Sequence, residues 1–447
     1  MKLNQFLSPF RVIIFSYFVL ILIGSFLLYL PISHKDGISL SFSDAFFTAA
    51  SAISVTGLTV VNTAETFSYV GVFFLALIIQ LGGIGIMTLG TFVWIMLGRK
   101  IVLSQRMLIM VDQNQTSYAG LVNLMKNILG IAILIELFGA MILGSYYLYY
   151  FDTWYEAYYQ GAFASLTAFT NAGFDITGQS LVPFANDYFV QFVTITLVIA
   201  GAIGFPVLVE IREYLAKRHQ NYRFSLFTKI TVTTYFILMV FGGISIWLLE
   251  RGKYYAGMEW HQQFFYSLFN SVSARSAGLA TMDVSNYSLA TLLLISALMI
   301  IGASPSSAGG GIRTTTVAVM FLTIRSFALG KKDVKVFGKE LHEDDIQKAF
   351  IVISVFVFIL ISAIILITAI EHSSKFALMA IIFEVSSAFG TCGLSMGITP
   401  QLSTASQFIL VVLMFIGRVG LVALLFSMKK KDTKSHVRYP KERIIIG

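Results

Sequence analysis

Four short stretches of the chain combine small residues with one glycine, in a way that suits cation binding by the backbone. Glycine adopts left-handed φ values that other residues rarely reach, so it can turn a carbonyl oxygen toward a common axis. Several carbonyl oxygens around such an axis can replace the hydration shell of a monovalent cation. The four glycines are separated by 116, 105 and 115 residues. The predicted cation-binding residues are these glycines and the three residues before each of them: Ser54, Val55, Thr56, Gly57, Thr170, Asn171, Ala172, Gly173, Arg275, Ser276, Ala277, Gly278, Gly390, Thr391, Cys392 and Gly393.

The composition indicates that these turns lie in a membrane protein. The 447-residue chain is 57% hydrophobic and only 12% charged, with a mean hydropathy of +0.80, whereas soluble domains carry about 25% charged residues. Soluble enzymes, nucleic-acid-binding proteins and disordered scaffolds are therefore excluded. A membrane-spanning helix needs about 20 apolar residues. Eight runs meet this requirement: residues 12–30, 70–97, 128–150, 188–209, 230–249, 289–324, 349–370 and 408–428.

A shorter apolar segment precedes each glycine turn, at residues 42–54, 155–170, 262–274 and 376–389. As helices these segments reach only about 20 Å, which is too short to cross a bilayer. Ser41, Ser43 and Asp44 are expected to begin the first helix, and Ser373 and Ser374 the fourth. Because non-helical backbone at membrane depth is tolerated only inside protein or along water, each segment is predicted to be a re-entrant helix whose glycine turn lines a pore or a buried site.

Two spans, one re-entrant helix and one glycine turn make a unit that occurs four times along the chain. The units cover residues 1–98, 99–211, 212–330 and 331–447. Each unit contains two spans, so all four have the same orientation, unlike the inverted repeats of many secondary transporters. The predicted fold is an all-α polytopic membrane protein with eight transmembrane helices plus four re-entrant pore helices, in four parallel M1-P-M2 repeats around one pore.

The distribution of charge predicts the orientation of the chain. If both termini lie on one side, 24 of the 31 Lys and Arg residues fall on that side. The positive-inside rule makes this side cytoplasmic. The opposite loops are rich in acidic residues, so the outer face is expected either to attract cations or simply to be a solvated surface.

The sixth span contains a stretch that cannot remain helical, since it includes Pro305 and three consecutive glycines. A polar, flexible segment at mid-membrane is costly against lipid and suits a gate below the binding turns. Glycine pairs at 82–85 and 201–204 instead predict close helix packing. The predicted gate comprises Gly302, Ala303, Ser304, Pro305, Ser306, Ser307, Ala308, Gly309, Gly310, Gly311, Arg313 and Arg418.

Two buried charges accompany these segments. A charge at the bilayer centre costs about 2.5 to 3.5 kcal/mol, so Arg418 should face the protein interior or the pore. It either opposes cation passage below the turns or forms an ion pair with an interior acid such as Glu136, and both interpretations stay open. Arg275 is expected to point away from the cation-binding carbonyls, toward Glu384.

Enzymatic motifs are missing from the sequence. Its single cysteine, Cys392, excludes a disulfide framework and a cysteine-rich metal site. The six histidines are scattered, and there is neither an HExxH nor a Ser-His-Asp arrangement. The glycine-rich stretch in the sixth span lacks the preceding strand and the lysine of a nucleotide loop. No catalytic residues are predicted, and no cofactor is expected in this chain.

The turns resemble those of the Trk/Ktr/HKT superfamily of potassium transport proteins, most closely the membrane subunit of bacterial Ktr systems (KtrB/KtrD type). The matching stretches are VTGL around Gly57, FTNAGF through Gly173, RSAGL through Gly278, FGTCGLSMG through Gly393 and IGRVG around Arg418. The resemblance covers nearly the whole chain. It implies a homodimer with one pore per subunit, controlled by a cytosolic ring of nucleotide-binding subunits (KtrA/KtrC type). In the family, glycine at all four filter positions goes with potassium selectivity.

Residue patterns and resemblance together predict potassium uptake across the plasma membrane through a channel-like filter, with both termini cytoplasmic. The alternative is a sodium- or proton-coupled carrier with alternating access, in which the turns form an occluded site. Sodium as an activator or coupled ion stays open. Cys392 and Arg275 put exact fourfold symmetry of the turns in doubt.

Overall fold

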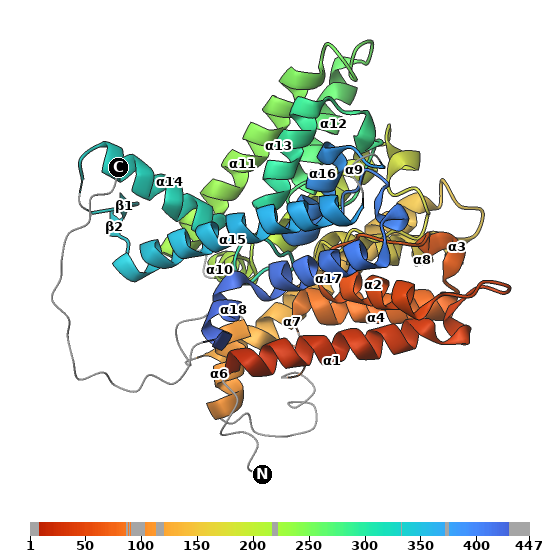
Figure 1. The fold of residues 1–447 in the computed structure, drawn as a ribbon, viewed down its shortest axis with the longest axis horizontal. Coiled ribbons are helices and arrows are strands. Elements are labelled where there is room, and N and C mark those ends of the chain that lie inside the picture. Colours follow the sequence, from red (N-terminus) through yellow and green to blue (C-terminus); the bar gives the residue numbers. More distant parts are fainter. Residues whose placement is uncertain are drawn as a thin grey trace.

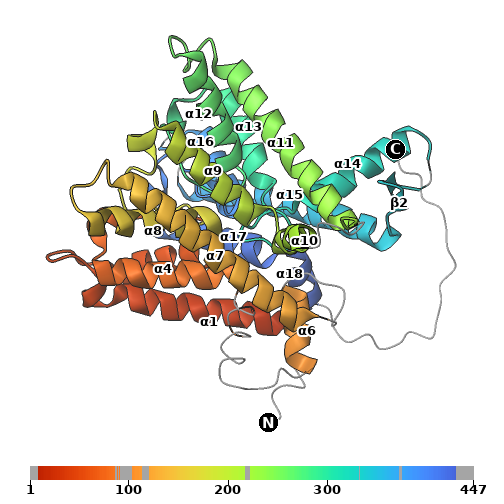
Figure 2. The same ribbon diagram turned by 180° about the vertical axis from the view of Figure 1, so that it is seen from behind.

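The computed structural model describes residues 9–85, 88, 90, 103–112, 120–216, 222–331, 333–371 and 375–428. These residues form helices, connecting loops and one two-stranded hairpin (Figures 1 and 2). In chain order the elements are α1 (Pro9–Tyr29), η2 (Pro31–Ser33), α2 (Phe42–Ile53), α3 (Thr63–Thr66), α4 (Tyr69–Ile84), α6 (Leu103–Asp112), α7 (Leu121–Tyr147), α8 (Trp154–Thr170), η3 (Val182–Phe184), α9 (Tyr188–Ala202), α10 (Phe205–Ala216), α11 (Leu226–Glu250), α12 (Trp260–Ser273), η4 (Val284–Asn286), α13 (Leu289–Ile300), α14 (Thr314–Ala328), β1 (Lys335–Val336), β2 (Lys339–Glu340), α15 (Glu343–Ile370), α16 (Leu378–Gly390), η5 (Thr399–Gln401), α17 (Thr404–Val419) and α18 (Leu421–Met428).

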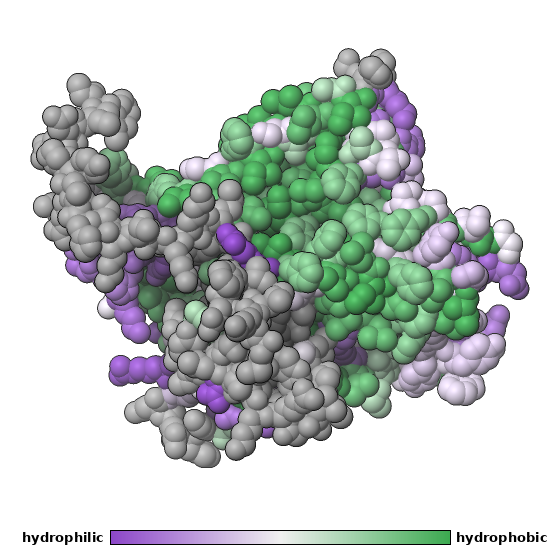
Figure 3. Space-filling view, turned by 60° about the horizontal axis from the view of Figure 1, so that its bottom comes forward, coloured by the Kyte–Doolittle hydropathy of each residue, from purple (hydrophilic) through white to green (hydrophobic). Residues whose placement is uncertain are grey.

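Long apolar helices alternate with shorter ones. Among the described helices, α1, α7, α11 and α15 are long and apolar enough to cross a membrane. Their outward side chains are largely apolar, for example Leu134 and Phe358, which are 69% and 73% exposed. In Figure 3 hydrophobic residues form a broad band between hydrophilic groups at either edge. Such a band is too large for a protein surrounded by water and matches a surface that contacts lipid.

The second apolar helix of each unit stops part of the way along its predicted span. Left-handed glycines follow α4, α9 and α17, namely Gly85, Gly204 and Gly420, with φ of +96°, +105° and +87°. After Gly204 the chain bends by 103° into α10. The prediction of continuous spans over 188–209 and 408–428 was therefore wrong, because a left-handed residue interrupts the helical hydrogen-bond ladder. Part of the predicted span 70–97 lies outside the described residues.

A second glycine lies three residues before each of these breaks. It lets α4, α9 and α17 closely approach α2, α8 and α16, respectively. A β-carbon on Gly82 would lie 2.2 Å from the carbonyl oxygen of Ile53. A β-carbon on Gly201 would lie 1.7 Å from the carbonyl oxygen of Phe169, and one on Gly417 would lie 2.0 Å from that of Phe389. The predicted close packing at 82–85 and 201–204 is confirmed for the first glycine of each pair, whereas the second glycine ends the helix.

The short helices that precede the glycine turns, α2, α8, α12 and α16, connect the four predicted units into a closed cycle. Each packs against a helix of its own unit, as α2 does against α1 and α4, and α8 against α7 and α9. Each also contacts the preceding unit through the pairs α4 with α8, α9 with α12, α13 with α16, and α17 with α2. Because the last pair returns to the first unit, the ends of the chain's repeats meet.

Polar groups at one end of each unit join its two apolar helices. Glu371, at the end of α15, accepts hydrogen bonds from the backbone N–H and hydroxyl of Ser403, which begins α17, at 2.7 and 2.6 Å. Glu250 does the same for Ser288 ahead of α13, at 3.0 and 2.6 Å. In the first unit the Ser68 hydroxyl donates to the Ile32 carbonyl at 2.7 Å. As predicted, Ser41 caps α2 and accepts from the Asp44 N–H at 3.1 Å, whereas Ser373 and Ser374 lie outside the described residues.

The Glu371 contact predicts a pH-dependent contribution to stability. Burial alone would raise the pKa of Glu371, but hydrogen bonds from Ser403 and Ser406 and the charge of Lys375 outweigh it and hold the pKa below 4.5. A lowered pKa stabilises the fold above the unfolded-state value, and this stabilisation is lost as the pH falls through the folded-state value. We expect the melting temperature to fall more steeply below about pH 4.5 in the wild-type chain than in Glu371→Gln. Parallel melting curves for the two proteins would contradict this assignment.

Candidate ion-binding site at the four glycine turns

The four predicted glycine turns meet at one place. A β-carbon built on Gly57 would lie 2.6 Å from the Ala172 carbonyl oxygen and 2.8 Å from the Cα of Gly173. A β-carbon on Gly173 would lie 3.3 Å from the Cα of Gly278, and one on Gly278 would lie 2.9 Å from the Cα of Gly393. The β-carbon position of Gly393 returns to the first turn, 2.2 Å from the Thr56 carbonyl oxygen. The turns therefore form a ring in chain order, with no room for a side chain at any of the four glycines.

Only the glycines of this ring are accessible. The other twelve predicted binding residues are buried, whereas Gly57, Gly173, Gly278 and Gly393 are partly exposed. The accessible surface of the ring is therefore made of glycine backbone atoms, not of side chains. Its chemistry is that of carbonyl dipoles, which favour cations.

The backbone of each turn is held in a strained conformation two residues before its glycine. Val55, Asn171 and Thr391 have φ of +57°, +57° and +47°, which is unusual for any residue with a side chain and costly for a β-branched one. Hydrogen bonds to the preceding pore helix fix this geometry. The N–H groups of Thr56, Ala172 and Cys392 donate to the carbonyls of Ser51, Thr167 and Ser387 at 2.8, 2.8 and 2.9 Å.

The third turn departs from this pattern. Ser276 has φ of +147°, and the N–H groups of Ala277 and Gly278 both donate to the Ser273 carbonyl, at 2.9 and 3.3 Å. In the first and fourth turns a serine hydroxyl accepts from the glycine N–H, at 3.1 Å from Gly57 to Ser51 and 3.0 Å from Gly393 to Ser387. Val272 occupies this position in the third turn and has no hydroxyl. Fourfold symmetry is thus broken at the third turn.

Cys392 keeps the geometry of the first and second turns and does not disturb the ring. Its thiol is fully buried and donates to the Ser273 carbonyl at 3.3 Å, which connects the fourth turn to the third.

Arg275 points away from the ring, as expected, but not toward Glu384. Its guanidinium lies over the ring of Tyr235, 3.9 Å from the centroid, and donates to the Tyr235 carbonyl at 2.8 Å and the Gly302 carbonyl at 3.4 Å. Glu384 instead accepts from Ser395, Met396 and Thr399 at 2.6 to 2.9 Å. The expected pairing was wrong, because hydroxyl and N–H donors just after the fourth turn already satisfy the carboxylate.

The predicted gate segment lies directly against the ring. Residues 301–313 interrupt the helix between α13 and α14, and of Gly302 to Gly311 only Ser306 is not buried. The Gly310 N–H donates to the Thr391 hydroxyl at 2.9 Å. A β-carbon on Gly309 would lie 2.0 Å from the Ser276 hydroxyl. Two residues of the loop thus touch the third and fourth turns.

Other units hold the same loop in place. The N–H groups of Ser304 and Ala308 donate to the carbonyls of Ala202 and Gly201 at the end of α9, at 3.0 and 3.1 Å. The Gly311 N–H donates to the Gly417 carbonyl in α17 at 3.1 Å. The breaks in α9 and α17 thus supply the backbone partners that a loop at membrane depth requires.

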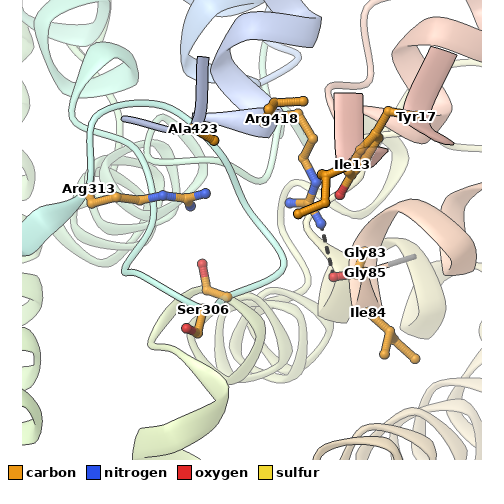
Figure 4. Close-up of a pocket in the computed structure, with 11 residues that line it drawn as sticks. Ile13, Tyr17, Gly83, Ile84, Gly85, Ser306, Arg313, Arg418 and Ala423 are labelled. Atoms are coloured by element: carbon orange, nitrogen blue, oxygen red, sulfur yellow. Dashed lines mark hydrogen bonds between the residues drawn. The ribbon is translucent and has the colours of Figure 1, made fainter. Parts of the chain in front are cut away.

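Arg418 connects this loop to the first unit. Its guanidinium donates to the carbonyls of Ala308 and Gly82, and to that of Gly83 at 3.1 Å (Figure 4). The side chain is 7% exposed. Glu136 accepts from Gln80 at 2.8 Å instead, so the interpretation of Arg418 as the ion-pair partner of Glu136 was wrong. Arg313, which also belongs to the predicted gate, donates to the Gly309 carbonyl at 2.6 Å and stabilises the loop from within.

The sequence interpretation missed several partners of this site. Tyr235 holds Arg275, the Thr391 hydroxyl anchors the loop, and the carbonyls at 201–202 complete it. The broken glycine pattern at 201–204 was the available signal for the last of these.

The described residues contain no cluster of three or more His, Cys, Asp or Glu side chains that could hold a metal ion.

Comparison with known proteins identifies the family of the chain. The family model TrkH, described as cation transport protein, matches residues 4–437. The Ktr system potassium uptake protein D of Bacillus subtilis is 52% identical over 446 residues, which cover 100% of this chain and 99% of the relative. The potassium/sodium uptake protein NtpJ of Enterococcus hirae is 33% identical over 450 residues, with 100% and 99% covered.

A solved structure shares the fold. The crystal structure of the potassium transporter TrkH from Vibrio parahaemolyticus matches with a TM-score of 0.74 at 18% identity, over 96% of this chain and 86% of that one. The chain therefore belongs to the TrkH/Ktr family of cation transport proteins, which are multi-pass membrane proteins and not enzymes.

Proposed function

We propose that the protein takes up potassium across the plasma membrane through a channel-like pore whose selectivity filter is the ring of glycine turns. The observation that carries this proposal is the ring itself, in which four partly exposed glycines from four units lie in contact. Two relatives, named as a potassium uptake protein and a potassium/sodium uptake protein, support potassium as the ion. In this proposal the sixteen residues predicted from the sequence form the filter, and the carbonyls of its turns replace the hydration shell of the ion.

The loop at 301–313 and Arg418 form the gate in this proposal. The loop contacts the filter through Gly309 and Gly310, and Arg418 holds its Ala308 carbonyl against the first unit. While these contacts last, the loop blocks the inner side of the filter, and the positive charge of Arg418 opposes cations. Opening requires release of the loop from both.

The proposed assembly rests on the resemblance of the sequence to Ktr membrane subunits. The four units at 1–98, 99–211, 212–330 and 331–447 surround one pore, and two copies form a homodimer with both termini cytoplasmic. A cytosolic ring of nucleotide-binding subunits of the KtrA/KtrC type regulates it. Any effect of that ring must reach the loop, because a ligand shifts a gate only through differential affinity for its open and closed states. Helix α14 begins at the loop and supplies a direct route.

A sodium- or proton-coupled carrier is the second candidate. The relative NtpJ, named as a potassium/sodium uptake protein, supports it. Potassium flux through purified protein in liposomes, with and without an opposing sodium gradient, distinguishes the two. A channel-like pore conducts potassium without sodium on either side. Strict dependence of potassium flux on sodium would overturn the pore and support the carrier.

The ring predicts which glycine substitution disturbs selectivity most. A serine at Gly57 or Gly393 places its β-carbon 2.6 or 2.2 Å from a backbone oxygen, whereas at Gly173 the nearest atom is 3.0 Å away. We expect Gly57→Ser and Gly393→Ser to lower the potassium-to-sodium flux ratio about tenfold or more, and Gly173→Ser less, as judged from reversal potentials. Equal ratios in all three inserted variants would count against these glycines as filter residues.

Replacing Arg418 separates its charge from its contacts. Arg418→Ala removes both the positive barrier and the bond to the loop, so we expect cation flux to rise several-fold with selectivity kept. Arg418→Lys keeps the charge but cannot bridge the Ala308 and Gly82 carbonyls as a planar guanidinium does. Flux through the lysine variant should lie between those of alanine and wild type. Unchanged flux in well-folded Arg418→Ala would exclude a gating role.

Loop removal tests the gate itself. We expect deletion of residues 304–310 to give flux that no longer depends on nucleotide or partner, because the block is gone while the four turns remain. Gly310→Ala is a milder variant, since its β-carbon would lie 2.5 Å from the Thr391 hydroxyl and push the loop off the filter. If both variants still respond to partner and nucleotide as wild type does, the main gate lies elsewhere.

A further inference from the structure

A small cavity lies beside the gate loop, between Arg418 and Arg313. It is lined by the start of α1, the end of α4, the loop and the region where α17 gives way to α18. In Figure 4 the guanidinium groups of Arg313 and Arg418 approach it from two sides, with Ser306 below. Its volume is about 60 Å³. Because one water needs roughly 10 to 15 Å³, the cavity has room for a small ion with a few waters but not for a nucleotide.

The charges around this cavity are unbalanced. Two arginines contribute to its wall, and none of its eleven lining residues is acidic. The two ion pairs found in the described part of the chain, Lys335 with Asp333 and Lys348 with Asp345, involve neither arginine. Backbone carbonyls accept from both guanidinium groups, but a carbonyl is a dipole and does not cancel a full charge. Arg418 is buried and Arg313 is partly buried, and two like charges that share the wall of one cavity are costly without a counter-ion.

Arg418 also retains an unused donor. Its two terminal nitrogens bind carbonyls of the loop and of α4, while its Nε is buried and has no hydrogen-bond partner among the residues that the structure describes. Arg313 uses its Nη1 for the carbonyls of Gly309 and Ser304. Arginine carries five N–H donors, and since these two bonds of Arg313 both come from Nη1, its other N–H groups can bind an acceptor in the cavity.

We infer that this cavity binds a small inorganic anion of the chloride class between Arg313 and Arg418. A chloride ion supplies one negative charge, accepts several N–H donors at once and fits the volume. It would reduce the positive potential just below the filter, so a bound anion would assist cation passage through the open gate. This second consequence rests on the proposed function, whereas binding itself does not.

A carboxylate of the chain's own tail is the competing occupant. The residues beyond the described range include Asp432 and Glu442. Deletion of residues 429–447 distinguishes the two occupants. It removes the carboxylates of the tail but leaves a free anion able to bind.

Binding can be measured without transport. Crystals grown in bromide should give an anomalous peak between Arg313 and Arg418. In detergent at constant potassium, replacing gluconate by about 0.1 M chloride should raise the melting temperature by about 2 °C or more. Arg313→Gln should lose this shift. Arg325→Gln, an exposed arginine at the other end of α14, is the matched control and should keep it.

Each outcome decides the inference. A bromide peak with a chloride shift that survives deletion of residues 429–447 supports a free anion. If the shift and peak emerge only after that deletion, a tail carboxylate is the native occupant and the inference is wrong. Absence of both in the wild-type chain also overturns it, and because the peak needs no variant, failure of Arg313→Gln to fold leaves the test intact. If chloride binds to the wild-type protein but does not change its cation flux, the proposed gate is wrong, whereas the anion site stands.

Discussion

The structure depends on one constraint, which is that backbone N–H and carbonyl groups at membrane depth must find partners within the protein. Four turns and several helix breaks expose such groups here, and the chain satisfies them by bringing its units into contact. The pore helices supply carbonyls to their own turns, and the breaks in α9 and α17 supply partners to the loop at 301–313. Glycine makes this possible, because Gly82, Gly201 and Gly417 allow backbone to approach backbone. The result is a closed cycle in which the four glycines of the turns lie in contact and stay partly exposed.

In the proposed function, the loop and Arg418 give this closed cycle an open and a closed state. Arg418 carries a charge that would be costly in lipid, yet its guanidinium has carbonyl acceptors on two different units, so it is stabilised where it joins them. The same contact links the charge to the position of the loop. In the proposed mechanism, moving the loop therefore changes both the steric block and the field below the filter. An anion between Arg313 and Arg418 would adjust that field without contacting the filter.

The sequence was sufficient to predict the features that depend on spacing or on residue type. The turn positions followed from four glycines at similar separations of 116, 105 and 115 residues, and the loop from Pro305 and the glycines at 309–311. The partners of Arg418 and Arg275 could not be predicted, because the acceptors are main-chain carbonyls, which every residue has. The interruption of α9 and α17 was also missed, since a glycine adopts a left-handed φ only where the surrounding packing requires it. The expected pairs with Glu136 and Glu384 failed because nearby neutral donors satisfy those carboxylates.

The central claim is that the glycine turns hold the transported ion through their carbonyl oxygens. Anomalous diffraction from crystals soaked in rubidium or thallium, which replace potassium, tests it most directly. The account predicts density on the axis enclosed by Gly57, Gly173, Gly278 and Gly393, which weakens in Gly57→Ser. Ordered density elsewhere in the membrane region, with none inside this ring, would contradict it.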